Sequence, residues 1–241
     1  LRSDQEAALA ALLVHDTGIL YAPTAFGKTV TAAALIAQRG VNTLVLVHRT
    51  ELLQQWKERL QAFLGADKTK IGTIGGGKAK PTGIIDIAVM QSLSRQGEVS
   101  EQVKNYGQII VDECHHLSAF SFEALLKAAG AKYVLGLTAT PVRRDGQQPI
   151  IFMQCGPIRH TASRPESAPA DLAVTPQWLS RPIVMPEGTG IQDVFLQVCS
   201  DTERTAKIAA EVGDSFDQGR KILVLTERTD HLSIIQEQIG R

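Results

Sequence analysis

The sequence predicts an α/β fold in which a mainly parallel sheet carries helices on both faces. Short, almost wholly apolar runs recur at residues 18–21, 43–47, 84–90, 109–111 and 133–137. Such runs are typical of strands that are buried on both faces of a parallel sheet. Segments with apolar residues at helical spacing lie between them, and this alternation indicates right-handed βαβ units. With 44% hydrophobic residues, the 241-residue chain can bury a core of one large or two smaller domains.

The first part of the chain contains the elements of one such domain. Ser3 and Glu6 have the spacing of a capping box, which predicts a helix start at residue 3. Further helices are expected over residues 30–37 and 52–63, where the apolar side chains indicate core packing. A short strand is expected at 71–74, inside a Gly- and Lys-rich stretch that is either a solvated loop or a nucleic-acid contact. Residues 150–152 are predicted to be the last strand.

A change in composition follows this domain. Residues 161–190 are predicted to be an extended linker, because they hold five of the ten prolines: Pro165, Pro169, Pro176, Pro182 and Pro186. We therefore expect a first domain over 1–160 and a second over 191–241.

The predicted second domain holds helices at 191–198, 201–218 and 230–239, and a strand at 221–226. Ser200 and Glu203 form a second capping-box pattern, and Gly219 follows the end of that helix. One strand cannot form a sheet, so this domain is expected to be truncated. The start at Leu1, without Met, also suggests a piece of a longer protein.

The stretch Ala22-Pro-Thr-Ala-Phe-Gly-Lys-Thr29 lies between a predicted strand and a predicted helix. This is the context of a phosphate-binding loop, where backbone N–H groups and a helix N-terminus face phosphate oxygens. Gly27 permits close approach of the backbone, Lys28 places a charge on the outer phosphates, and the Thr29 hydroxyl can reach Mg²⁺. Ala22 stands where the pattern usually has glycine.

A second candidate site follows the strand that ends at Val111. Asp112 can bind Mg²⁺, and Glu113 can orient and deprotonate an attacking water. Both groups follow a strand end, where ligands of open α/β sheets bind.

Charge and cysteine content argue against several classes of protein, among them disulfide-rich, zinc-binding and membrane-spanning proteins. The formal net charge is zero, so no global field indicates nucleic acid, although local contacts stay compatible with it. Cys114, Cys155 and Cys199 are too few and scattered for a disulfide framework, which favours a reducing, cytoplasmic location. Cys114-His115-His116 lacks a second ligand cluster, which argues against zinc. We find no signal peptide and no membrane-spanning run.

The motifs together resemble superfamily-two helicases of the DEAH/DExH-box group. Residues 22–29, Asp112-Glu113-Cys114-His115 and Thr138-Ala139-Thr140 look like motifs I, II and III of that group. Residues 46–52, 89–92 and 138–146 are similar to the branch of the xeroderma-type repair helicases and restriction-enzyme translocases. Residues 225–228 resemble motif IV, which opens a second RecA-like lobe. The resemblance therefore implies a RecA-like sheet and a partial second RecA-like lobe.

The resemblance also implies roles for single residues. ATP would be held by Arg2, Gln5, Thr24, Ala25, Phe26, Gly27, Lys28 and Thr29, with Gln5 and Arg2 at the adenine. Thr29 and Asp112 would hold Mg²⁺, and Lys28, Asp112 and Glu113 would be catalytic. His115, Thr138 and Thr140 would couple the nucleotide to nucleic acid. The strand itself, DNA rather than RNA, would contact Arg49, Thr50, Gln91 and Ser92 through its phosphates.

Three functional readings follow. The first is the motor domain of a nucleic-acid-dependent ATPase. The second is an ATP- and strand-binding fragment with negligible turnover, because motifs V and VI and their arginine finger are absent. The third is a phosphate-loop enzyme of another class, such as a small-molecule kinase, which would not need residues 138–140 or Gln5.

Overall fold

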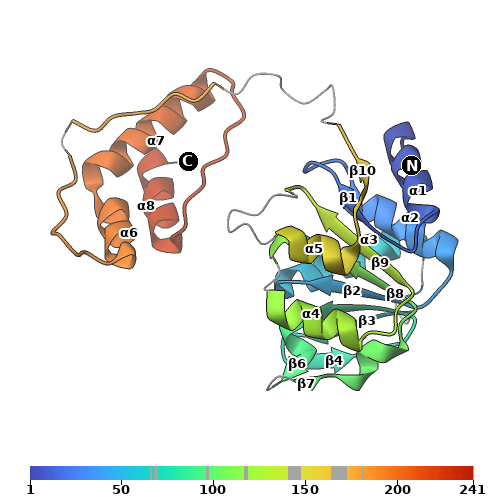
Figure 1. Cartoon of the computed structure of the whole chain (residues 1–241). Helices are drawn as coiled ribbons and strands as arrows, with labels where there is room; N and C mark the ends of the chain where they lie inside the picture. The colour runs from blue at the N-terminus through green and yellow to red at the C-terminus, as the bar shows by residue number, and fades with distance from the viewer. Residues whose placement is uncertain are drawn as a thin grey trace. The chain divides into compact units, whose positions relative to one another are not determined.

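The protein is described here by a computed structural model that covers residues 1–65, 67, 70–95, 98–116, 119–140, 148–163, 173–180 and 182–240. The chain divides into two compact units, Leu1–Ala170 and Asp171–Arg241, and each is described by itself (Figure 1). The boundary between them lies within the segment predicted as a linker.

The first unit is built on a mainly parallel sheet. Its strands are β1 (Thr17–Tyr21), β2 (Thr43–Val47), β3 (Ile71–Gly75), β4 (Lys78–Lys80), β5 (Ile85–Val89), β8 (Gln108–Val111), β9 (Tyr133–Thr138) and β10 (Ile158–Thr161). They lie in the order β10-β1-β9-β8-β2-β5-β3-β4. Every pairing is parallel except that of β4 with β3. In a separate small sheet, β6 (Ser94–Arg95) pairs antiparallel with β7 (Glu98–Val99).

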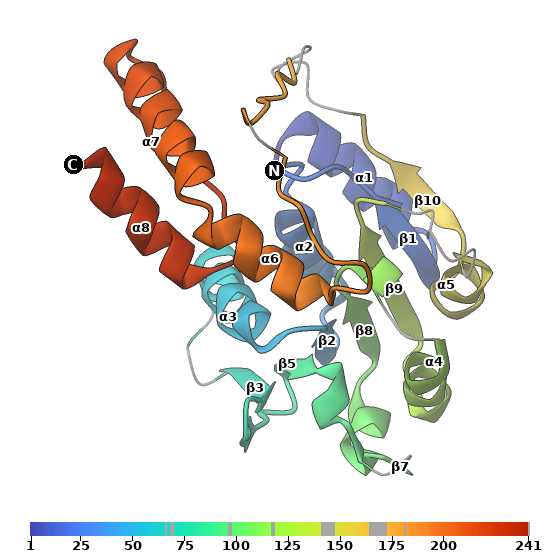
Figure 2. The same ribbon diagram turned by 90° about the vertical axis from the view of Figure 1, so that its left-hand side faces the viewer.

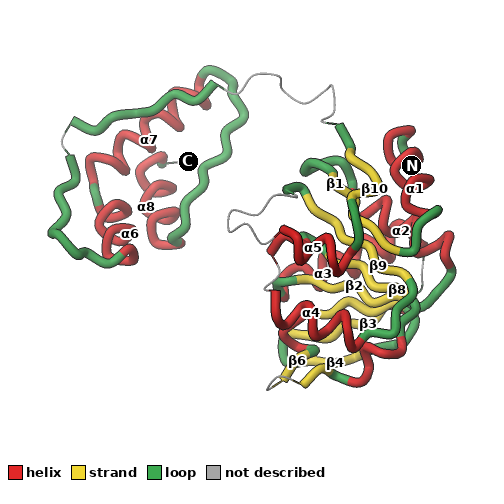
Figure 3. The backbone as a smooth tube through the Cα atoms, viewed as in Figure 1, coloured by secondary structure: helices red, strands yellow, loops and turns green. Residues whose placement is uncertain are grey.

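Helices cover both faces of this sheet (Figures 2 and 3). The α-helices of this unit are α1 (Ser3–Leu13), α2 (Lys28–Arg39), α3 (Thr50–Leu64), α4 (Ala119–Ala128) and α5 (Gln148–Cys155). Short 3₁₀ turns lie at Met90–Ser92, Glu101–Asn105 and Cys114–His116.

Two apolar clusters form the core, one on each side of the sheet. Alternate residues of one strand belong to different clusters, because successive side chains point to opposite faces. Val45 and Val47 pack with residues of α1, α2 and α3, whereas Leu44 and Leu46 pack with residues of α4 and α5. The predicted α/β fold with helices on both faces is therefore confirmed.

Two predictions for the first unit are wrong. Residues 150–152 belong to helix α5, in which Ile151 and Cys155, four residues apart, are buried while Met153 is 79% exposed. The edge strand is instead β10, in which Arg159 and His160 interrupt the apolar run that marks the other strands. The capping box is also displaced by one residue, because Arg2 is the N-cap and its N–H donates to the Gln5 Oε1 at 3.0 Å.

The second unit has helices α6 (Ile191–Ser200), α7 (Thr202–Asp217) and α8 (Thr229–Ile239), close to their predicted bounds. Its helix α7 is capped by Asp201, whose carboxylate accepts the Arg204 N–H at 2.7 Å, and not by Ser200. The predicted strand at 221–226 is not formed. Leu223 and Leu225 are 81% and 83% exposed, and no strand of the described residues lies beside them to accept or donate ladder hydrogen bonds.

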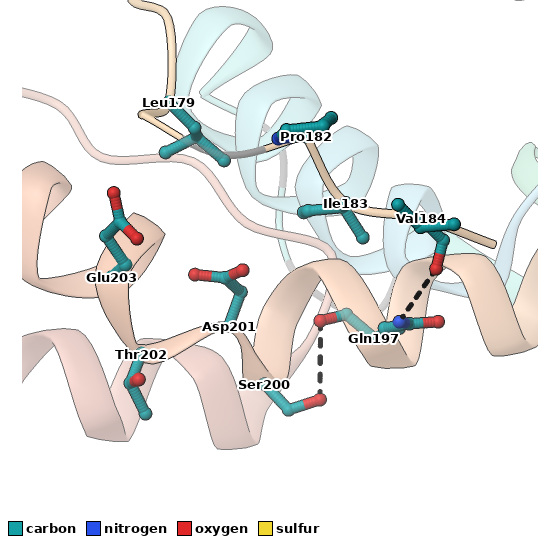
Figure 4. A pocket seen from close by; sticks show the side chains of 9 residues that line it. All are labelled: Leu179, Pro182, Ile183, Val184, Gln197, Ser200, Asp201, Thr202 and Glu203. Carbon is teal, nitrogen blue, oxygen red and sulfur yellow. Dashed lines mark hydrogen bonds between the residues drawn. The ribbon is translucent and has the colours of Figure 1, made fainter.

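A cavity of about 470 Å³ lies in the second unit between Leu179 and residues 182–184 on one side and the α6–α7 junction on the other (Figure 4). None of the predicted site residues lines it, and its Asp201 carboxylate is used to cap α7. In the part of the chain that the structure describes, no helix has the length and apolar character needed to cross a membrane.

Candidate active site

The predicted motifs follow five neighbouring strands at one edge of the sheet. Strands β1, β9, β8, β2 and β5 are adjacent and parallel, so their carboxyl ends lie along the same edge. The phosphate loop follows β1, Thr138 ends β9, Asp112 follows β8, Arg49 follows β2 and Gln91 follows β5. The topology thus places motifs from residues 22 to 140 in one continuous row.

The phosphate loop is set by two residues with left-handed backbone. Gly27 has φ 91° and is the N-cap of α2, so the first amides of that helix are directed at the loop. Ala25 has φ 69°, which is costly for a residue with a Cβ and is typical of strained functional loops. The Phe26 side chain is fully buried in the core, so only its main chain remains a candidate for nucleotide contact.

Arg2 and Gln5 brace this loop from the start of α1. The Gln5 Nε2 donates to the Phe26 carbonyl at 2.8 Å, and the Arg2 Nη2 donates to the same oxygen at 2.7 Å. Gln5 is 4% exposed, and a Cβ at Gly27 would lie 2.5 Å from its Nε2. The structure therefore shows both residues bonded to the phosphate loop, and contact with adenine stays a prediction.

The phosphate loop meets the acidic motif through Lys28. Its Nζ donates to the Ala22 carbonyl at 3.1 Å and lies 3.8 Å from the Glu113 Oε1. Both side chains are largely buried, at 11% and 26% exposure, which strengthens their interaction. Glu113 has φ 46°, a second strained backbone position in the row.

His115 connects Glu113 to the end of β9. The His115 Nδ1 lies 3.3 Å from the Glu113 Oε2 and 2.9 Å from the Thr138 Oγ1. The Thr138 Oγ1 also accepts the Thr140 N–H at 3.1 Å, and the Thr138 carbonyl accepts the Ala22 N–H at 3.0 Å. The three predicted coupling residues therefore form one hydrogen-bonded chain that reaches back to the phosphate loop.

Asp112 has a partner that the sequence did not indicate. The indole Nε1 of Trp56, on helix α3, donates to the Asp112 Oδ2 at 2.7 Å. Burial raises the pKa of the Asp112 carboxyl, and the Trp56 hydrogen bond acts in the opposite direction. Trp56 was predicted as a core residue, which it is, at 2% exposure. The helical spacing of Trp56 predicts that its ring is buried, but it does not predict a hydrogen bond to a carboxylate 56 residues away.

The donor set at this point fits a hard divalent cation. Mg²⁺ prefers oxygen ligands and is usually held through one or two carboxylates together with substrate phosphates. Asp112 supplies the carboxylate, and Thr29 supplies a hydroxyl that at present accepts a 3.3 Å hydrogen bond from the Arg59 Nη1. Cys114, by contrast, is buried in the core, and burial raises the pKa of its thiol well above the ordinary value.

The predicted strand-binding residues lie further along the row. Arg49, Thr50, Gln91 and Ser92 are all exposed. Gln91 and Ser92 line a cavity of about 660 Å³ together with Gly77 and Lys78 of the β3–β4 hairpin. The hairpin belongs to the Gly- and Lys-rich stretch that the sequence predicts to be either a solvated loop or a nucleic-acid contact.

Comparison with known proteins decides the family. Residues 1–143 match the family described as "Type III restriction enzyme, res subunit", which is more than half of the chain. The chain belongs to this family. Its relatives place this restriction-enzyme family member among the superfamily-two helicases that are similar to the xeroderma-type proteins, as the motifs predicted.

This chain is similar to several curated relatives, each of which is matched over only part of its own length. The DNA 3'-5' translocase XPB2 of Sulfurisphaera tokodaii is 35% identical over 168 residues, which are 70% of this chain and 37% of the relative. The DNA 3'-5' helicase XPB of Mycobacterium tuberculosis is 33% identical over 67% of this chain and 30% of its own. The probable helicase D10 of Escherichia phage T5 is 28% identical over 93% of this chain and 48% of its own. The chain thus spans less than half the length of each.

Solved structures confirm the RecA-like helicase fold of this family member. The UvsW helicase from bacteriophage T4 aligns with a TM-score of 0.57 and 22% identity, over 65% of this chain and 58% of that one. The Hef helicase domain of Pyrococcus furiosus aligns with a TM-score of 0.55 and 17% identity, over 100% of this chain and 53% of that one.

Proposed function

We propose that this chain is the ATP-binding motor lobe of a DNA-dependent ATPase that hydrolyses ATP to ADP and phosphate. The observation that carries the proposal is the contact of Lys28 with Glu113, 3.8 Å apart, at the junction of the phosphate loop and the acidic motif. This pairing places a cation for the outer phosphates beside a carboxylate that can accept a proton from water.

Different residues of the chain would bind the phosphates, accept the proton and hold the metal ion. The amides at the start of α2 and the Lys28 ammonium bind and orient the phosphates, in exchange for the present Lys28 contacts with Ala22 and Glu113. Glu113 accepts the proton of the attacking water. Thr29 and Asp112 would hold Mg²⁺, which supplies positive charge to the phosphate oxygens when bound.

The series of side-chain contacts from Glu113 through His115 to Thr138 supports a role in coupling the nucleotide site to the bound strand. A change at Glu113 on nucleotide binding alters its 3.3 Å contact with His115, and His115 is bonded to the end of β9. These groups lie in the row between the phosphate loop and the exposed residues that follow β2 and β5. A response to nucleotide can therefore pass along one sheet edge toward the bound strand.

DNA is the proposed partner. The two relatives at 33–35% identity are named as a DNA 3'-5' translocase and a DNA 3'-5' helicase. One structure with the same fold is the SWI2/SNF2 ATPase core of Sulfolobus solfataricus in complex with double-stranded DNA. Binding would rest on phosphate contacts, so it should weaken as salt rises.

The test compares Glu113→Gln with Glu123→Gln. Both changes remove one carboxylate and keep its shape, but Glu123 lies on α4 in an ion pair with Lys127. Glu113→Gln should retain ATP binding by calorimetry and lose phosphate release, in the presence and absence of single-stranded DNA, whereas Glu123→Gln should match the wild type. Turnover by Glu113→Gln at the wild-type rate would assign the base to another residue.

The same assay separates the rival functions. ATP and DNA binding by the wild type without phosphate release would favour the binding fragment with negligible turnover. Phosphate transfer to a small molecule at a rate that DNA does not change would favour a kinase.

A further inference from the structure

Helix α3 carries two side chains that donate to the two residues expected to hold Mg²⁺. The Trp56 Nε1 donates to the Asp112 Oδ2 at 2.7 Å. The Arg59 Nη1 donates to the Thr29 Oγ1 at 3.3 Å. Trp56 and Arg59 are three residues apart, so they lie on the same face of the helix. One turn of α3 therefore contacts both oxygen ligands, although it belongs neither to the phosphate loop nor to the acidic motif.

The two contacts differ in how easily they break. Trp56 is 2% exposed and packs in the apolar cluster with residues of α2, so its indole cannot leave Asp112 without unpacking the core. Arg59 is exposed, and its long side chain can take other rotamers at little cost in packing. Its hydrogen bond to Thr29 is also longer than the usual N–H···O distance. The Trp56 contact is thus fixed, whereas the Arg59 contact is removable.

Positive charge gathers around the Thr29 hydroxyl. The guanidinium of Arg59 stays protonated in proteins. Thr29 is the second residue of α2, whose N-terminus carries the positive end of the helix dipole. The Lys28 ammonium lies at the same end, and Glu113 balances its charge at 3.8 Å. The additional charge of Arg59 therefore favours an anion at this end of α2 and opposes a further cation.

This arrangement treats a free metal ion and a metal–nucleotide complex differently. A bare divalent cation at Thr29 would lie close to the Arg59 guanidinium, and the two positive charges would repel each other. Nucleotide phosphates carry more negative charge than one divalent ion neutralises, so their metal complex is a net anion and is attracted to a helix N-terminus. Arg59 can then turn away and leave the Thr29 oxygen to the metal.

We propose that Arg59 closes the Thr29 hydroxyl to a free divalent metal ion and releases it when the metal arrives with the phosphates of a nucleotide. The site then takes up metal and nucleotide together, not metal first. This inference rests on the proposed function, in which Thr29 and Asp112 hold Mg²⁺. It adds a positioning residue that lies outside the helicase-like motifs, and it fixes the order in which the ligands bind.

The test is a titration of the nucleotide-free full chain with Mn²⁺, a paramagnetic substitute for Mg²⁺, followed by electron paramagnetic resonance of the unbound ion. Arg59→Ala should bind Mn²⁺ about two- to thirtyfold more tightly than the wild type, because a divalent ion doubles the interaction energy of an exposed pair of single charges. Arg59→Gln should show the same gain, since it removes the charge but keeps an N–H donor, whereas Arg59→Lys should stay close to the wild type. Adding Asp112→Ala to Arg59→Ala should remove the gain.

Lys57→Ala is the matched control. It removes the same charge from the same helix, two residues earlier and on a different face. It should raise Mn²⁺ affinity less than Arg59→Ala does. Equal gains in the two variants would overturn the proposal. Unchanged Mn²⁺ affinity in Arg59→Ala, or a gain that survives Asp112→Ala, would overturn it as well.

A second titration offers Mn²⁺ together with a non-hydrolysable ATP analogue and is followed by calorimetry. Here Arg59→Ala should bind no more tightly than the wild type, because the complex is a net anion. A gain as large as that for Mn²⁺ alone would refute the discrimination by Arg59. If the wild type does not bind the complex at all, the proposed function fails. If it binds the complex and Arg59→Ala gains nothing with Mn²⁺ alone, only the role of Arg59 fails.

Discussion

The hydrogen bond from Trp56 to Asp112 gives the most specific prediction. Trp56→Phe retains an aromatic ring in the core but removes the N–H that lies 2.7 Å from the Asp112 Oδ2. Hydrogen bonds to charged groups contribute about 1.5–3 kcal/mol, and the smaller ring loses about 1 kcal/mol of packing. We expect the free energy of unfolding to fall by about 2–4 kcal/mol.

A double-mutant cycle separates the hydrogen bond from the packing loss. Trp56→Phe, Asp112→Ala and the double variant would be unfolded in urea with a metal chelator present and followed by far-ultraviolet circular dichroism, because alanine removes the acceptor of the Trp56 N–H altogether. The coupling energy should be about 1–3 kcal/mol, because the two side chains are in direct contact. The cycle needs no nucleotide, so it measures the bond itself.

The control is Trp178→Phe, the same chemical change at a tryptophan that is 81% exposed and lies in the other unit. This variant should unfold as the wild type does. It also leaves Trp56 as the single tryptophan, whose fluorescence should change when Mg²⁺ and ATP bind next to Asp112. A coupling energy near zero together with unchanged fluorescence would refute the positioning of Asp112 by Trp56.

Three further outcomes are expected. Lys28→Ala should lower ATP affinity about tenfold or more by calorimetry, because it removes the cation at the loop; an equal loss in Lys132→Ala would contradict a specific role. Tyr106 donates to the buried Asp86 at 2.6 Å, and burial raises the pKa of its phenol, so stability is complete below pH about 10 and falls above it. Tyr106→Phe should lower stability at pH about 7 by about 1–3 kcal/mol and flatten that alkaline decrease in urea unfolding; an unchanged alkaline slope would speak against it. Ala25→Gly should raise the free energy of unfolding by up to about 1 kcal/mol, since it relieves the left-handed backbone at φ 69°, and a lower melting temperature would refute this.

The sequence by itself determined the features that depend on neighbouring residues. The apolar runs predicted the strands β1, β2, β5, β8 and β9, because a strand buried on both faces is apolar throughout. The phosphate loop and the acidic pair were recognised because each is a short segment that follows such a run. Their order along the chain was sufficient to indicate the family.

Only the tertiary structure decided whether certain short apolar segments form a helix or a strand. Residues 150–152 are compatible with a strand or a helix, and packing of Ile151 and Cys155 against the sheet selects the helix. Residues 221–226 have strand character, but no strand lies beside them in the described unit. Both helix caps lie one residue from their predicted positions, because Arg2 pairs with Gln5 and Asp201 accepts the Arg204 N–H in place of the predicted serine caps, and sequence patterns locate helix ends only to within one or two residues.

Contacts between distant residues also depended on the tertiary structure. The order β1-β9-β8-β2-β5 brings Lys28 to Glu113 and His115 to Thr138, and no local pattern contains that order. The same holds for the hydrogen bond of Trp56 to Asp112 and for the cavity that Gln91 and Ser92 line together with Lys78. The physical reason is that helix and strand periodicity reports only which face of a segment is buried, whereas the partner on that face is set by how the whole sheet assembles.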